Sequence, residues 1–173
     1  MDGSSKFGEG NQYAFFPSAA LAWRASQEDF IRNMGLFDDL KLRVSYGRTG
    51  NQDIGNYASL ATLGSTVYAF GGNRGIGFVP STLANPDLKW ETTDQLNAGI
   101  DAGFLNNRVS VTADYYDKRT HDLLLYVPIP ATSGFGTSLQ NVGEVKNSGF
   151  ELGLRTVNLT GPLNWESSLN LSF

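Results

Sequence analysis

Apolar and polar side chains alternate along six segments of this chain. In one of them Leu96, Ala98 and Ile100 oppose Asn97 and Asp101. A period of two places successive side chains on opposite faces of an extended strand, so each segment predicts a strand with one apolar and one polar face. We expect antiparallel strands, each paired with its sequence neighbour in a strongly curved open sheet, near residues 14–25, 39–49, 88–104, 108–120, 144–157 and 163–173.

The connections between these segments alternate between short and long. Leu105–Asn107 and Thr160–Pro162 are short turns, and a small helix with Ser26 as its N-cap joins the first two strands. The segments 50–87 and 121–143 are long; the first is rich in Gly, Asn and Tyr, and the second contains the turn-forming runs 128–130 and 132–135. A compact soluble domain rarely carries loops of that length. Outer-membrane barrels combine short periplasmic turns with long outer loops.

Large aromatic side chains gather towards the ends of the predicted strands, while the middles hold aliphatic residues. This distribution is typical of the two aromatic girdles at the interfaces of a membrane barrel. The aromatic residues are Phe15, Phe16, Trp23, Tyr46, Trp90, Phe104, Tyr115, Phe150 and Trp165. The fold class predicted is therefore all-β, an antiparallel up-and-down transmembrane β-barrel segment of about six strands.

Composition narrows the function classes. The chain is 40% hydrophobic and 17% charged, which fits one folded domain. A net charge of -4 without a Lys/Arg cluster argues against nucleic acid as a partner. No apolar run approaches the roughly 18 residues of a transmembrane helix. The absence of cysteine excludes a disulfide framework and a thiolate metal site.

Several long runs of residues closely resemble the later barrel strands of SusC/RagA-type TonB-linked outer-membrane proteins. The resemblance spans nearly the whole chain, and its pieces follow the order of the predicted strands. The runs are DGSSKFGEGNQYAFFPSAALAWRAS, LKLRVSYGRTGNQDIGNY, NPDLKWETTDQLNAGIDAGFLNNRVSVTADYYDKRTHDLL and TSGFGTSLQNVGEVKNSGFELGL.

This resemblance implies a barrel of about 22 strands with a plugged lumen in the outer membrane of a Gram-negative bacterium. Such transporters import oligosaccharides or peptides, are energised through TonB, and work beneath a SusD-like lipoprotein. Residues 1–173 would form part of one barrel domain, in contact with outer-membrane lipid. The plug domain, the N-terminal part that reaches TonB and the remaining strands are not in this sequence, and truncation within a larger gene is the interpretation we favour.

Motifs that suggest enzyme chemistry are better explained otherwise. The glycine-rich stretches 47–51 and 71–77 lack the Gly-Lys-Ser/Thr ending of a phosphate-binding loop. The pairs Asp114 with Asp117 and Glu144 with Glu151 resemble glycosidase carboxylates, but any acidic β-protein offers such pairs. One histidine, His121, is a poor basis for a metal site. We expect no catalytic residue, no cofactor and no metal, and treat the sequon at Asn158 as chance.

Binding is the functional interpretation that remains for the longest loop. Exposed aromatic rings beside amide or guanidinium groups suit stacking on sugars or holding peptides. The alternative is that these side chains pack the loop on itself or on a partner lid. The candidates for ligand contact are Tyr57, Tyr68, Phe70, Asn73, Arg74 and Phe78.

Two other function classes stay open at this point. A soluble carbohydrate-binding β-sandwich would place the apolar faces of two sheets against each other. The unequal loops and the interface aromatics argue against it. A glycosidase is the third hypothesis, and it requires that neutralising the paired carboxylates abolish turnover.

Overall fold

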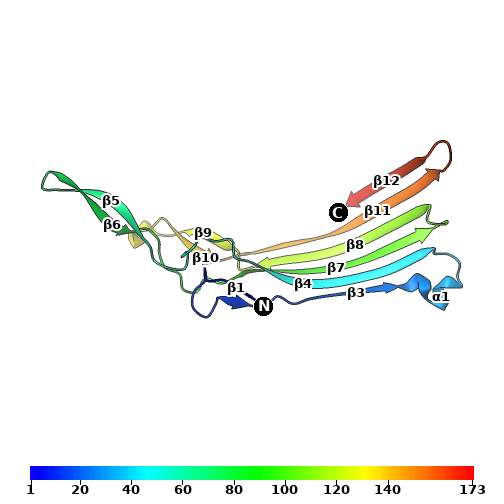
Figure 1. The fold of residues 1–173 in the computed structure, drawn as a ribbon, viewed down its shortest axis with the longest axis horizontal. Coiled ribbons are helices and arrows are strands. Elements are labelled where there is room, and N and C mark those ends of the chain that lie inside the picture. Colours follow the sequence, from blue (N-terminus) through cyan, green and yellow to red (C-terminus); the bar gives the residue numbers. More distant parts are fainter. The chain divides into compact units, whose positions relative to one another are not determined.

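Six of the strands form one sheet in which neighbours in the chain are neighbours in space. The computed structural model describes residues 1–173. The order is β12-β11-β8-β7-β4-β3, and successive arrows point in opposite directions (Figure 1). This confirms the predicted pairing of sequence-adjacent antiparallel strands. The strands are β3 (Ser18–Arg24), β4 (Asp39–Asn51), β7 (Glu91–Phe104), β8 (Val109–His121), β11 (Glu144–Leu159) and β12 (Trp165–Ser172).

The chain divides into two compact units, which are described separately. We call the first the sheet unit; it contains residues 17–48, 94–119 and 146–173. We call the second the loop unit; it contains residues 1–16, 49–93 and 120–145.

The register of the sheet unit keeps apolar residues opposite one another. Leu21 lies opposite Val44, and Trp23 lies opposite Leu42. In the last hairpin, β11–β12, Leu152 lies opposite Leu171. Since paired residues project to the same face of a sheet, the register joins the apolar stripes of neighbouring strands into one surface.

The short turn between β7 and β8 is tight because three successive residues adopt positive φ. Leu105, Asn106 and Asn107 have φ of 57°, 58° and 58°. Asparagine tolerates this left-handed region better than most residues. The backbone N–H of Asn107 also donates to Asp38 Oδ2 at 3.0 Å, which fixes the turn against the start of β4.

The connection between β3 and β4 differs from the prediction at its N-terminus. A 3-10 turn (η1, Ala25–Gln27) precedes a four-residue helix (α1, Asp29–Arg32). The N-cap is Glu28, without a side-chain cap bond, so the assignment of Ser26 as N-cap was wrong. The Ser26 hydroxyl instead donates to Asp39 Oδ1 at 3.2 Å.

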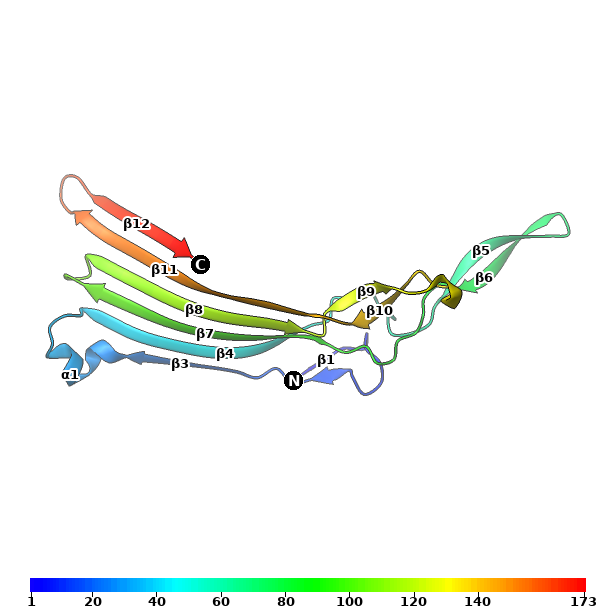
Figure 2. The same cartoon turned by 180° about the vertical axis from the view of Figure 1, so that it is seen from behind.

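The loop unit holds short two-stranded ribbons that the alternation did not predict. Two of them, β5–β6 and β9–β10, lie in the segments expected to be long loops, and β1–β2 lies near the N-terminus; a second view shows β5 and β6 as a separate hairpin (Figure 2). The elements are β1 (Asp2–Gly3), β2 (Tyr13–Ala14), β5 (Leu63–Phe70), β6 (Asn73–Pro80), β9 (Leu124–Pro128), η2 (Ala131–Ser133) and β10 (Thr137–Asn141).

A small hydrophobic core holds the loop unit together. Leu88 has no exposed surface, and Phe7 is 2% exposed. The ring of Trp90 packs against Phe7 at 5.2 Å and against Phe16 at 5.3 Å between centroids. Burying these side chains removes apolar surface from water, which is the dominant favourable contribution to folding. The core members are Phe7, Ile54, Leu88, Trp90 and Leu139.

Two of the aromatic residues assigned to the girdles therefore have another role. Phe16 and Trp90 pack within the loop-unit core rather than at a membrane interface, so those two assignments were wrong. In the sequence both residues stand near strand ends, as girdle residues do, but in the structure they pack into the hydrophobic core of the loop unit. Tyr46, Tyr115 and Phe150 are exposed on the sheet, as expected for interface positions.

The apolar face of the sheet unit is not covered by a second layer. Leu21 is 69% exposed, Ile100 46% and Leu169 52%. In a sandwich these side chains would be buried against a facing sheet, so the structure contradicts the two-layer alternative. The helices are too short and too polar to be transmembrane spans.

Candidate functional site: the polar face of the sheet and the exposed hairpin

The polar face of the sheet unit carries an ion-pair network that spans three strands. Arg43 of β4 donates from Nε to Asp101 Oδ2 at 2.8 Å and from Nη2 to Asp101 Oδ1 at 2.9 Å. The same Nη2 reaches Asp114 Oδ1 of β8 at 3.0 Å. A guanidinium that bridges two carboxylates in this way cross-links β4, β7 and β8 on one face.

Gly99 makes room for this network. A Cβ atom at position 99 would overlap Asp114 Oδ1 and would lie 2.9 Å from Arg43 Nη2. The glycine therefore allows the two charged side chains to meet above the backbone of β7, and any larger residue would push them apart.

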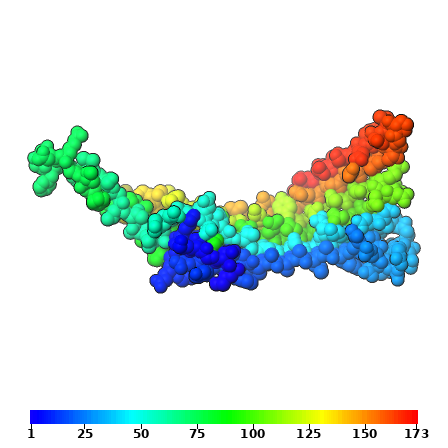
Figure 3. All heavy atoms as spheres, viewed as in Figure 1, coloured from blue at the N-terminus to red at the C-terminus, as the bar shows by residue number.

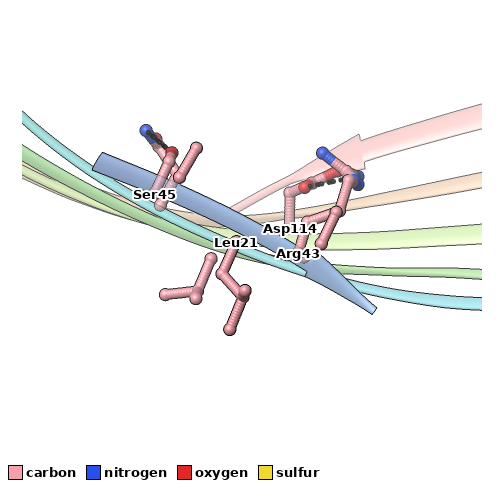
Figure 4. Close-up of a pocket in the computed structure, with 9 residues that line it drawn as sticks. Leu21, Arg43, Ser45 and Asp114 are labelled. Carbon is pink, nitrogen blue, oxygen red and sulfur yellow. Dashed lines mark hydrogen bonds and ion pairs between the residues drawn. The ribbon is translucent and has the colours of Figure 1, made fainter. Parts of the chain in front are cut away.

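Polar and apolar side chains lie on opposite faces of the strands. Figure 4 shows Leu21 on one side of the strands and Arg43, Ser45 and Asp114 on the other. An open depression of about 250 Å³ lies over β3, β4, β7 and β8, and most of its lining residues, Arg43, Asn97 and Asp114 among them, project to the polar face. It is open rather than enclosed, so its shape does not suit burial of a small ligand.

Neither carboxylate pair considered for enzyme chemistry is brought together, because the members of each pair lie an odd number of residues apart on one strand and so face opposite sides. Asp114 lies on the polar face with Arg43, whereas Asp117 is three residues away along β8 and so faces the opposite side. Asp117 is paired with Arg119 and Lys146. His121 Nδ1 lies 3.6 Å from Glu144 Oε2, which is an ion-pair distance.

The ligand-loop candidates fall mainly on the β5–β6 hairpin, which stands out from the rest of the loop unit (Figure 3). Gly71 and Gly72 form its two-residue turn with φ of 57° and 82°. Positive φ at both central positions is the requirement of a type I′ turn, which glycine meets without strain.

The hairpin register divides the candidates between two faces. Phe70 is paired with Asn73, and Tyr68 lies two residues away on the same strand, so these three share one face. Arg74 and Phe78 project to the other face. The sequence could not have separated them without the register.

Tyr57 lies outside the hairpin, in a turn where its φ is 63°. Phe70 is 89% exposed and Phe78 71%. The aromatic candidates are therefore accessible, and three of the six candidates lie on one face of the hairpin.

Comparison with known proteins identifies the family. The whole chain, residues 1–173, matches the family described as TonB dependent receptor-like, beta-barrel. TonB-dependent receptor P26 of Formosa agariphila is 44% identical over 172 residues, covering 99% of this chain and 17% of that protein. TonB-dependent receptor SusC of Bacteroides thetaiotaomicron is 37% identical over 179 residues, covering 99% of this chain and 18% of that protein.

A solved structure shows the same backbone arrangement. The RagAB peptide transporter matches with a TM-score of 0.86 and 38% identity, over 99% of this chain and 19% of that chain. The chain thus spans less than a fifth of each of these relatives. It belongs to the TonB-dependent receptor β-barrel family and is of the SusC/RagA type.

Proposed function

We propose that this chain is one segment of the barrel wall of an outer-membrane transporter that imports oligosaccharides or peptides. The observation that carries the proposal is the two-sided sheet unit. One face exposes aliphatic and aromatic side chains, and the other holds the Arg43 network. A lipid-facing apolar surface opposite a polar lumen is what a transport barrel needs.

Relatives support the choice of substrate class and partner. One similar structure is described as a peptide transporter, and another relative is SusC. We propose that the barrel works with a SusD-like lipoprotein and draws energy from TonB through a plug-bearing N-terminal part. Deleting the full-length gene should abolish uptake of a labelled oligosaccharide or a labelled peptide; unchanged uptake of both would contradict the proposal.

The isolated chain should not be a soluble monomer. In the six-stranded order β3 and β12 each have only one neighbour, whereas the smallest bacterial barrels close with about 8 strands. Unpaired edge N–H and C=O groups together with an exposed apolar face favour aggregation. Size-exclusion chromatography should therefore give aggregates without detergent. A monodisperse monomer in buffer would contradict the membrane assignment.

We propose that the Tyr68, Phe70 and Asn73 face of the hairpin contacts the transported ligand. Phe70→Ala in the full-length transporter should raise the half-saturating concentration for uptake roughly fivefold, since a stacked ring contributes about 1 kcal/mol. The measurement is initial uptake rate against labelled substrate concentration in whole cells.

A matched control separates ligand contact from general loss of surface aromatics. Tyr126 of β9 is 70% exposed and is not among the candidates. Tyr126→Ala should leave the half-saturating concentration unchanged. Equal effects of the two substitutions, or no effect of Phe70→Ala, would refute the assignment of the hairpin.

A further inference from the structure

The apolar face of the sheet unit ends in a row of ionic side chains. Tyr46 of β4 is followed, two residues on and on the same face, by Arg48. The Tyr46 hydroxyl donates to Asp94 Oδ1 at 2.6 Å, and Arg48 Nε donates to the same oxygen at 2.8 Å. The shared partner places all three side chains on one face, at the end of β4 that leads to the long loop.

On β8 and β11 the apolar face also gives way to ionic side chains. Tyr115 is followed on its own face of β8 by Asp117 and then by Arg119. Arg119 Nε lies 3.0 Å from Asp117 Oδ1, and Lys146 Nζ of β11 lies 3.2 Å from Asp117 Oδ2. Four strands therefore pass from apolar to ionic side chains at the same end of the sheet unit. We call Arg48, Arg119 and Lys146 the cation row.

The cations of this row are more exposed than their carboxylate partners. The side chains of Arg48, Arg119 and Lys146 are 42%, 49% and 51% exposed, whereas those of Asp94 and Asp117 are 20% and 17% exposed. Each carboxylate oxygen already accepts a hydrogen bond or an ion pair from the row or from Tyr46. Among these five side chains the N–H donors are consequently more exposed than the carboxylates, and there is one more cation than carboxylates. Glu144, on the same face of β11, is paired with His121.

We infer that the cation row binds the phosphate groups of a phosphorylated lipid in the outer leaflet. Guanidinium and ammonium donors bind phosphate oxygens by charge-assisted hydrogen bonds. The row lies directly beyond Tyr46 and Tyr115 along their strands, and tyrosine side chains at membrane interfaces lie at the level of the lipid headgroups. A lipid whose tails cover the apolar face would place its headgroup beside this row. The inference rests on the proposed barrel function.

The test uses the full-length transporter, purified in a non-ionic detergent. Native mass spectrometry would titrate it with phosphorylated lipid A and with chemically dephosphorylated lipid A. Arg119→Gln/Lys146→Gln should weaken binding of phosphorylated lipid A on the order of tenfold or more, because each basic residue near an anionic lipid surface contributes about 1 kcal/mol. Binding of dephosphorylated lipid A should not change.

Two control variants distinguish charge from structural damage. Lys118→Gln removes a neighbouring cation that projects to the opposite face of β8, and it should leave lipid binding unchanged. Asp117→Asn breaks the same ion pairs but keeps both cations, so binding should stay equal or become tighter. Weakening by Asp117→Asn equal to that of the double variant would overturn the inference.

Further readouts cover a folding defect and a failure of the proposed function. Arg119→Lys keeps the charge and should retain binding even if the double variant does not fold. Raising the salt concentration should weaken wild-type binding to phosphorylated lipid A, and insensitivity to salt would count against the inference. Substrate uptake by the Arg119→Gln/Lys146→Gln cells, if retained while lipid binding is lost, supports both proposals. If the wild-type transporter takes up substrate but binds phosphorylated and dephosphorylated lipid A equally well, the lipid inference is overturned and the proposed function is not.

Discussion

Ile100→Lys should destabilise the full-length barrel by about 2–4 kcal/mol, the cost of a lysine on the lipid face near the bilayer midplane. Ile100 lies on the apolar face in the middle part of β7 and is 46% exposed. In the proposed barrel that exposure is to lipid tails, where an ammonium group has no water and no partner. The measurement is urea unfolding of the full-length protein in lipid vesicles.

The matched variant is Asn97→Lys. Asn97 lies three residues from Ile100 on the same strand, and its Nδ2 donates to Ser45 Oγ at 3.3 Å on the polar face. A lysine there meets water and polar neighbours, so it should be nearly neutral. The two sites lie at nearly the same depth in the bilayer, so the main difference between the variants is whether the side chain faces lipid or the lumen. Equal destabilisation, or a larger effect of Asn97→Lys, would show that the lipid face has been assigned wrongly.

Leu88→Ala should reduce the free energy of unfolding of the loop unit by about 2–5 kcal/mol, the range for truncating a fully buried leucine. Leu88 has no exposed surface and packs in the cluster that contains Phe7 and Trp90. The neighbouring backbone has little freedom to collapse into the cavity, because a Cβ at Gly8 would already overlap the carbonyl oxygen of Pro86. Amide hydrogen exchange in the full-length protein should accelerate across the loop unit.

A control for this prediction is Leu60→Ala in the same unit. Leu60 is 55% exposed, so its truncation should leave amide exchange in the loop unit nearly unchanged. If both variants accelerate exchange equally, the buried cluster is not what orders the unit. If neither does, the unit is held by its backbone hydrogen bonds alone.

The six wall strands could be predicted because each obeys one simple periodicity. From Leu96 to Phe104 in β7 and from Val109 to Tyr115 in β8 every second residue is apolar, which is the mark of a strand with one apolar face. The hairpin β5–β6 was not predicted because its two faces do not differ in polarity. Val67 and Tyr68 are both exposed although they project to opposite faces, so no alternation marks the strand.

The sites were less accessible to sequence reasoning because they depend on register. Arg48 and Asp94 are far apart in the chain, and only the pairing of β4 with β7 brings them to 2.8 Å. The division of the hairpin candidates between two faces has the same origin, since Phe70 meets Asn73 only through a two-residue turn. Trp90 was assigned wrongly for a related reason, because its partner Phe7 lies far from it in the sequence, near the N-terminus.

The loop-unit cluster has a consequence for the order of folding. It joins Phe7 to Leu139, with Ile54 and Leu88 contributed by the segments between them. A cluster assembled from such distant positions must close large loops before any of its contacts form, and non-local contacts of this kind are slow to appear. The segments of the loop unit should therefore become protected together and late, only after the segment that carries Leu139 has met the one that carries Phe7.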